Sequence, residues 1–291
     1  MRRFRFWLIR VVIAATAAPL HAQERVNVVA SFSILGDFVK NVGGDRVDVT
    51  TLVGPNGDVH VYDPAPSDAK TITGARLLVI NGLGLEGWLP RLLQSSGGKA
   101  AIITATRGIA PLKVGSDADP HAWQSVANAK IYVTNITDAL VAADPADAEV
   151  LRANAQAYLT KLDALEREVR AAVAKIPPGR RKVISTHDAF GYFAVAYGIE
   201  FIAPLGVSTE SEASARDIAG IITEIKREKI PAVFLENISD PRLIRRISAE
   251  TSARVGGTLY SDSLTGEKGE APTYIELVRH NIKALTGALA D

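Results

Sequence analysis

Two sets of short β-rich apolar runs, separated by one long helical segment, constrain the fold of this chain more than any other feature. In the first set, four runs alternate with amphipathic stretches, at residues 26–31, 47–52, 77–81 and 101–104. The second set repeats the pattern at residues 182–186, 199–203, 232–236 and 254–259. Strands that alternate with helices in this way predict parallel sheets with helices on both faces. We therefore expect an α/β protein with two similar lobes.

The segment between the two sets has the composition of a helix. Asp144 followed by Pro145 supplies an N-cap and a proline at the first helical position. From there to Ile176 the chain contains no glycine and no further proline, and apolar residues recur at helical spacing from Leu151 to Val173. Some thirty helical residues span roughly 45 Å, which suits a rigid strut between two lobes. We predict an N-terminal lobe at residues 23–144, a connecting helix at 145–177 and a C-terminal lobe at 178–291.

Residues 1–22 have the pattern of a cleavable export signal. Arginines at positions 2, 3, 5 and 10 precede or border the apolar run 11–20, and Leu20-His21-Ala22 offers a cleavage site before Gln23. The apolar run is too short to span a bilayer. Paired arginines near the start leave twin-arginine export as an alternative to ordinary secretion. Because the chain has no cysteine, it also has no lipid-anchor cysteine, and we expect a periplasmic protein.

The charge that remains after removal of the signal excludes one class of partner. The remaining 269 residues carry 29 basic and 32 acidic side chains. A chain of net charge about −3 has no basic field with which to hold nucleic acid. No later segment reaches 18 consecutive apolar residues, so we expect a soluble product, and we expect it to be a monomer.

Three of the four histidines beyond the signal have the context of metal ligands. His60, His121 and His187 lie next to acidic residues at loop or strand ends, whereas His280 lies inside the closing amphipathic helix 273–285. Asp262 follows the last predicted strand as His187 follows the strand 182–186, at the sheet edge where α/β proteins bind ligands. Three imidazoles and one carboxylate suit Zn²⁺ and can also hold Mn²⁺ or Fe²⁺. The gaps of 61, 66 and 75 residues form no local motif, so spacing alone leaves open whether the four make one site.

Four sequence blocks resemble those of a known family. They are GDVHVYDPAPSDAKTITGARLLVINGLGLEGWL, DPHAWQSVANA, STHDAFGYFAVAYGI and GGTLYSDSL. The chain resembles, along essentially its whole mature length, the periplasmic zinc/manganese solute-binding proteins of ABC transporters (cluster A-I). This resemblance implies two α/β lobes joined by one long rigid helix, with the metal bound in the cleft between them. It implies the ligands His60 and His121 from the first lobe, and His187 and Asp262 from the second.

The resemblance also implies partners and a metal. It implies a receptor, and no enzyme, that delivers its ion to an ABC permease in the inner membrane, with a periplasmic metallochaperone as a further partner. Histidine at the third ligand position, His187, favours Zn²⁺ as the transported ion, with Mn²⁺ or Fe²⁺ as the alternative. Val59 stands where the family usually has proline, and the chain between Asp63 and Asp68 lacks the His- and Asp-rich loop of many zinc members. Because binding requires neutral imidazoles, affinity should fall below about pH 6.

Neighbouring residues suggest supporting roles. The acids beside the ligands, Asp58, Asp119 and Asp188, are placed to accept N–H bonds from ligand imidazoles, with helix capping as the alternative for the latter two. Trp88 and Trp123 are expected to pack, and Glu86 to form structural hydrogen bonds. Residues 207–214 are a candidate mobile loop near the cleft.

The sequence offers three alternatives to metal transport. A zinc hydrolase needs an open coordination position and a general base. The chain has no H-E-x-x-H sequence, and a fourth protein ligand would fill the open position. The run from Gly82 to Gly87 matches the dinucleotide pattern G-x-G-x-x-G, but residues 104–106 lack the acid that such a site requires. A metallochaperone or adhesin on the same scaffold is the third alternative.

Overall fold

A computed structural model describes residues 24–290, so the predicted signal at 1–22 lies outside the described residues. The first sheet has the order β2-β1-β3-β4, and all its neighbouring strands are parallel. Its strands are β1 (Val26–Phe32), β2 (Val47–Val53), β3 (Leu77–Ile80) and β4 (Ala101–Thr104). The helices of this half are α1 (Ser33–Gly43), α2 (Pro66–Thr73), α3 (Leu89–Ser96) and α4 (Val126–Ala143).

Both faces of this sheet are covered, as the continuous apolar character of β1 requires for a central parallel strand. Val28 and Ala30 belong to the main hydrophobic core, which includes residues of α1 and α4. Val29, which points to the opposite face, belongs to a smaller core with Ile72 of α2 and Leu92 of α3. Successive side chains of β1 therefore point alternately into the two hydrophobic cores, one on each face of the sheet.

The second sheet repeats the arrangement with the order β10-β9-β7-β8, again entirely parallel. It consists of β7 (Lys182–Ile184), β8 (Glu200–Ile202), β9 (Ala232–Glu236) and β10 (Arg254–Leu259). Helices α7 (Ala215–Glu228) and α8 (Arg242–Ala249) cover one face, while α6 (Gly191–Tyr197) and α9 (Tyr274–Leu289) lie on the other. All eight predicted strands are confirmed, to within two residues at each end. The short hairpin of β5 (Lys113–Val114) and β6 (Asp117–Ala118) was not predicted.

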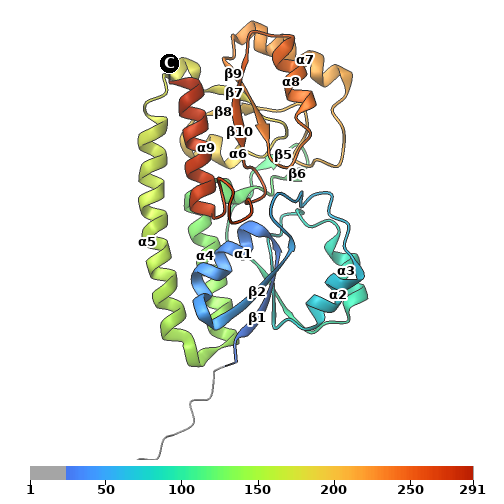
Figure 1. The fold of residues 1–291 in the computed structure, drawn as a ribbon, viewed down its shortest axis with the longest axis vertical. Coiled ribbons are helices and arrows are strands. Elements are labelled where there is room, and N and C mark those ends of the chain that lie inside the picture. The colour runs from blue at the N-terminus through green and yellow to red at the C-terminus, as the bar shows by residue number, and fades with distance from the viewer. Residues whose placement is uncertain (1–23, 291) are drawn as a thin grey trace, which may run out of the picture.

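Helix α5 (Ala148–Val173) connects the two halves and runs alongside both (Figure 1). Its 26 residues span about 39 Å. It is shorter than the expected range 145–177, because Pro145–Asp147 forms a separate 3-10 turn and the helix ends ahead of Pro177. Its buried stripe, from Leu151 to Val173, joins residues of both sheets in a single hydrophobic core. The halves therefore share packed structure along α5 in addition to their chain connection.

The carboxyl ends of the strands place loops from both sheets between the two halves. The segment after β7 and the segment after β10 come from the C-terminal half, and the loop after β2 comes from the N-terminal half. No helix within residues 24–290 is long and apolar enough to cross a membrane.

Candidate metal centre

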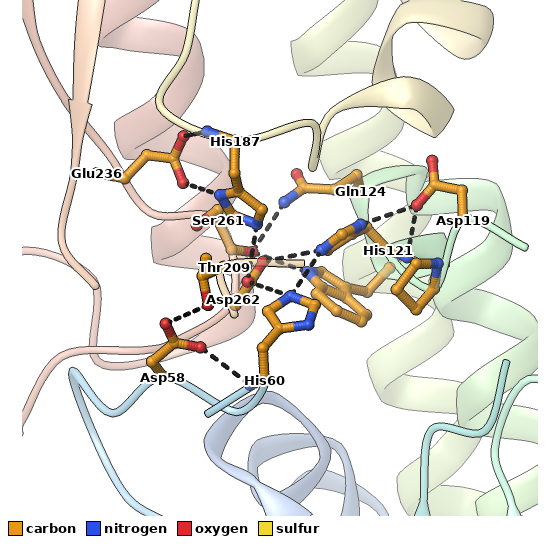
Figure 2. Close-up of polar contacts among 12 residues, drawn as sticks. Asp58, His60, Asp119, His121, Gln124, His187, Thr209, Glu236, Ser261 and Asp262 are labelled. Atoms are coloured by element: carbon orange, nitrogen blue, oxygen red, sulfur yellow. Dashed lines mark hydrogen bonds and ion pairs between the residues drawn. The ribbon is translucent and has the colours of Figure 1, made fainter. Parts of the chain in front are cut away.

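The four residues singled out in the sequence lie together between the two halves. One ligand atom from each of His60, His121, His187 and Asp262 lies within 4.8 Å of the other three. The side chains are buried: His60 is 6% exposed and the other three are 0% exposed. Figure 2 shows the three imidazole rings converging on the Asp262 carboxylate. His280 lies apart on α9, with Nε2 3.0 Å from the carbonyl oxygen of Thr258 and Nδ1 3.7 Å from a carboxylate oxygen of Glu270.

The spacing of the ligand atoms suits a small divalent cation. Nε2 of His60 lies 3.2 Å from Nε2 of His121 and 3.2 Å from Oδ2 of Asp262. Nε2 of His187 lies 3.1 Å from the same Oδ2, and Nε2 of His121 lies 3.7 Å from Oδ1. Ligands bound tetrahedrally to zinc at 2.0–2.1 Å are about 3.3 Å apart. The separations of 3.1 to 3.7 Å lie close to this value, so the donor atoms suit a zinc-sized ion.

Unpaired polar atoms at the centre support the same interpretation. Nε2 of His187 and both carboxylate oxygens of Asp262 are buried and, among the described residues, have no hydrogen-bond partner outside the cluster of four side chains. A buried polar atom without a partner is costly, and native proteins rarely contain several side by side. Here the polar atoms lie close together and are directed toward a common point, which is the geometry of a metal-binding site.

Two of the imidazoles are fixed by carboxylates on their far side. Nδ1 of His121 lies 2.8 Å from Oδ1 of Asp119, and Nδ1 of His187 lies 2.6 Å from Oε2 of Glu236. Each pairing leaves Nε2 of the ring directed toward the centre (Figure 2). Such carboxylates fix the ring orientation and tautomer of a ligand and make it a better electron donor.

The three predicted carboxylate partners have three different outcomes. The prediction is right for Asp119, which contacts the ring of His121. Asp58 instead accepts a hydrogen bond at 2.9 Å from the backbone N–H of His60. The prediction is wrong for Asp188, whose side chain lines a surface pocket with Arg216 and Glu224. Neither Asp119 nor Asp188 caps a helix through its side chain.

Sequence reasoning missed Glu236. It ends β9, and the strand order places β9 next to β7, which leads directly into His187. Its Oε1 also accepts the backbone N–H groups of Thr186 and His187, at 2.7 and 3.1 Å. The available signal was an acid at the carboxyl end of a buried strand, the same position that identified His187 and Asp262.

Charge around the centre perturbs two of the four groups. Burial opposes a charge on His187, but the carboxylates of Glu236 and Asp262 outweigh it and raise the pKa of His187 well above its usual value. Burial likewise opposes ionisation of Asp262, yet His187 and His121 outweigh it and hold the pKa of Asp262 well below its usual value. The centre thus keeps a buried carboxylate charged, as binding of a cation requires.

Side chains next to the ligands hold the ligand segments in place. Trp123 and Gln124 both donate to the carbonyl oxygen of Ser261, at 2.9 and 2.8 Å, directly before Asp262. Trp88 donates to the carbonyl oxygen of Val59, directly before His60, at 2.8 Å. The two tryptophans pack, as expected, and they also hold the ligand segments through hydrogen bonds, which was not expected.

The predicted structural role of Glu86 is confirmed. Its carboxylate accepts the hydroxyl of Ser31 at 2.7 Å and the backbone N–H groups of Asn81 and Gly82 at 2.6 and 3.1 Å. These bonds fix the glycine-rich turn after β3, in which Gly82 and Gly84 have positive φ angles of 82° and 86°. The run from Gly82 to Gly87 is thus a structural turn built around its own glutamate.

Known proteins resemble this chain along nearly all of its length. The family described as the periplasmic component A of zinc-uptake complexes matches residues 28–288. The iron-binding protein YfeA of Yersinia pestis is 36% identical over 284 residues, which cover 96% of this chain and 91% of that protein. The manganese-binding lipoprotein MntA of Halalkalibacterium halodurans is 33% identical over 300 residues, which cover 100% of this chain and 100% of that protein.

Solved structures share the fold as well. The periplasmic zinc-binding protein TroA from Treponema pallidum superposes with a TM-score of 0.88 at 30% identity, covering 92% of this chain and all of that one. A manganese-bound periplasmic metal-binding protein from Candidatus Liberibacter asiaticus superposes with a TM-score of 0.82 at 33% identity, covering 90% and 98%. These matches confirm the expected fold class and disfavour the hydrolase alternative. This chain belongs to the family of zinc-uptake component A, the metal-binding substrate receptors of ABC transporters, and is a receptor rather than an enzyme.

Proposed function

We propose that this receptor captures Zn²⁺ in the periplasm through His60, His121, His187 and Asp262, and delivers it to an ABC permease in the inner membrane. The observation that carries the proposal is the convergence of three imidazoles and one carboxylate, all buried, from four separate segments. Among the described residues, the same centre holds three buried polar atoms whose close polar neighbours are all members of the cluster itself. A bound cation would satisfy all three at once.

The donor set favours zinc, because imidazole suits Zn²⁺ better than it suits Mn²⁺. One observation favours the alternative, Mn²⁺ or Fe²⁺. Asp262 presents Oδ2 to His60 and His187 and Oδ1 to His121, so it can offer two oxygens to an ion that accepts more than four ligands. Relatives of this chain are named for iron and for manganese, and the two metals must therefore be compared directly.

The division of ligands between the halves gives a route for release. His60 and His121 come from the N-terminal half, and His187 and Asp262 from the C-terminal half. A shift of one half against the other would therefore remove ligands in pairs and weaken the site steeply. We propose that contact with the permease produces such a shift. We further propose that the receptor acts as a monomer, with a metallochaperone as its alternative source of metal.

Calorimetric titration of the metal-stripped protein at neutral pH tests the proposal. We expect one tight equivalent of Zn²⁺ and much weaker binding of Mn²⁺. Alanine at His60, His121 or His187 should weaken zinc binding at least about tenfold, since each change removes a ligand. His280→Ala is the matched control and should bind zinc as the unmodified protein does. Tight manganese binding would transfer the proposal to the alternative metal, and no tight binding of either would overturn it.

A further inference from the structure

The segments of the C-terminal half that border the candidate centre are tied to the N-terminal half to different degrees. On the side of Asp262, residues 261–264 accept or donate several hydrogen bonds with the N-terminal half. Trp123 and Gln124 bond the carbonyl oxygen of Ser261, and the backbone N–H of Leu264 donates to the hydroxyl of Ser33 at 3.0 Å. The backbone N–H of Asn56 donates to the carbonyl oxygen of Leu264 at 2.9 Å. The segment that carries Asp262 is therefore held firmly against the N-terminal half.

On the side of His187, helix α6 bonds the N-terminal half through the hydroxyls of Tyr192 and Tyr197, whereas the neighbouring segment 203–214 is held more lightly. The residues around His187, which follow β7, are bonded by segment 203–214 through backbone groups. The N–H of Asp188 donates to Gly206 at 3.1 Å, and the N–H of Leu205 donates to Thr186 at 3.3 Å. Among residues 24–290, one side-chain hydrogen bond links this segment to the N-terminal half: Thr209 Oγ1 donates to Oδ2 of Asp58 at 2.7 Å.

Asp58 is the residue that connects this segment to a ligand. Its second oxygen, Oδ1, accepts the backbone N–H of His60 at 2.9 Å. One carboxylate therefore holds the turn that carries His60 and, across the gap between the halves, the segment that covers His187 (Figure 2). Both Asp58 and Thr209 are half-buried, and His60 is the only one of the four candidate ligands with measurable exposure, at 6%. The Asp58–Thr209 bond thus lies on the accessible side of the centre.

We propose that the Asp58–Thr209 hydrogen bond is an interlobe latch that slows dissociation of the bound metal, with Asp58 and Thr209 acting as positioning residues. The inference rests on the proposed function, because it requires an ion at the centre. Breaking the bond frees segment 203–214 from the N-terminal half and loosens the turn of His60, so that the ligands of the two halves separate more often. A hydrogen bond to a charged group is strong enough for this effect to be measurable.

The test is a stopped-flow measurement of zinc release into an excess of a chromogenic chelator. Thr209→Val removes the hydroxyl without changing the shape of the side chain and should release zinc roughly three- to tenfold faster. Thr209→Ser keeps the hydroxyl and should restore slow release. In an Asp58→Ala background, Thr209→Val should add nothing further, because the acceptor is already absent. Thr223→Val, the same substitution at an exposed position of α7, should release zinc at the unmodified rate.

Hydrogen exchange of the metal-free protein gives a second readout that needs no ion. Thr209→Val should accelerate exchange in residues 58–62 and 205–212, whereas Thr223→Val should leave both segments unchanged. Tight zinc binding with unmodified release and exchange in Thr209→Val would overturn the latch and leave the proposed function intact. Absence of zinc binding by the unmodified protein would overturn the proposed function, and exchange would then decide separately whether the two segments are coupled.

Discussion

Two buried carboxylates, one at the helix junction and one at the candidate metal centre, respond to burial in opposite ways. Asp37 of α1 is 9% exposed, and Asp262 is 0% exposed. Burial raises the pKa of Asp37 to about 6, only partly offset by hydrogen bonds from Tyr274, Tyr158 and Asn41. At Asp262 burial acts in the same direction, but His187 and His121 outweigh it and hold the pKa of that carboxyl well below its usual value.

The difference lies in the neighbours. Asp37 accepts hydrogen bonds from neutral donors: the backbone N–H of Tyr274 at 3.0 Å, the amide of Asn41 at 3.1 Å and the hydroxyl of Tyr158 at 3.3 Å. The charge of Lys40 also lowers the pKa of Asp37, but less than these bonds do. These groups come from α9, α1 and α5, so this carboxylate joins one helix of each half to the connecting helix. Neutral donors do not fully replace water around a charge, whereas imidazoles that can become cations do. Burial among mainly neutral donors thus raises the pKa of a carboxyl group, whereas the imidazoles around Asp262 lower it.

The largest test of this contrast replaces the charged carboxylate at the centre by its neutral isostere. Asp262→Asn keeps the size of the side chain but removes the anionic oxygen ligand, so zinc affinity should fall about a hundredfold or more. Calorimetric or competitive titration with a chelator of known affinity measures the loss. An affinity within about threefold of the unmodified protein would exclude Asp262 as a ligand.

The pH dependence of metal binding tests the charge of His187, the imidazole that lies beside the Asp262 carboxylate. The raised pKa of His187 means that the metal-free protein carries a proton on this ring at neutral pH, and the metal must displace it from Nε2. Below that raised pKa, each zinc bound should release about one proton and affinity should fall about tenfold per pH unit. The decline therefore begins at higher pH than the value near 6 expected for unperturbed imidazoles.

Titrations in buffers of different ionisation enthalpy count the released protons. Glu236→Gln removes one of the two carboxylates that raise the pKa of His187, and should reduce the proton release near neutral pH. Zinc binding without proton release, and with constant affinity between about pH 6 and pH 8, would contradict the charged state assigned to His187.

Sequence reasoning found what local rules can detect. The eight strands follow from runs of β-branched residues, and Asp119 was identified because it stands two residues from His121. The partnership of Glu236 with His187 spans 49 residues, and that of Asp58 with Thr209 spans 151. Both depend on the order of strands and on how the two halves meet, which no local pattern encodes. The prediction for Asp188 failed because a residue adjacent to His187 in the sequence need not direct its side chain toward the ligand ring.

The smallest expected effect concerns Asp37 and appears in stability rather than binding. Because its folded-state pKa of about 6 lies above the usual 3.8, the folded protein binds more protons than the unfolded chain between these values. This residue therefore lowers the free energy of unfolding as pH rises from about 4 to about 6, by roughly 1–3 kcal/mol.

Asp37→Asn should remove that slope, because the amide oxygen can still accept the N–H of Tyr274 but carries no charge to desolvate. Denaturant unfolding of metal-free protein across this pH range should make the variant progressively more stable relative to the unmodified protein as pH rises. Asp138→Asn, at an exposed position of α4, is the control and should show no such trend. Zinc affinity should change less than about twofold in Asp37→Asn, since this carboxylate lies away from the centre. A large loss of affinity would mean that the helix junction and the metal centre act as one unit, and that the contrast between the two carboxylates is not local.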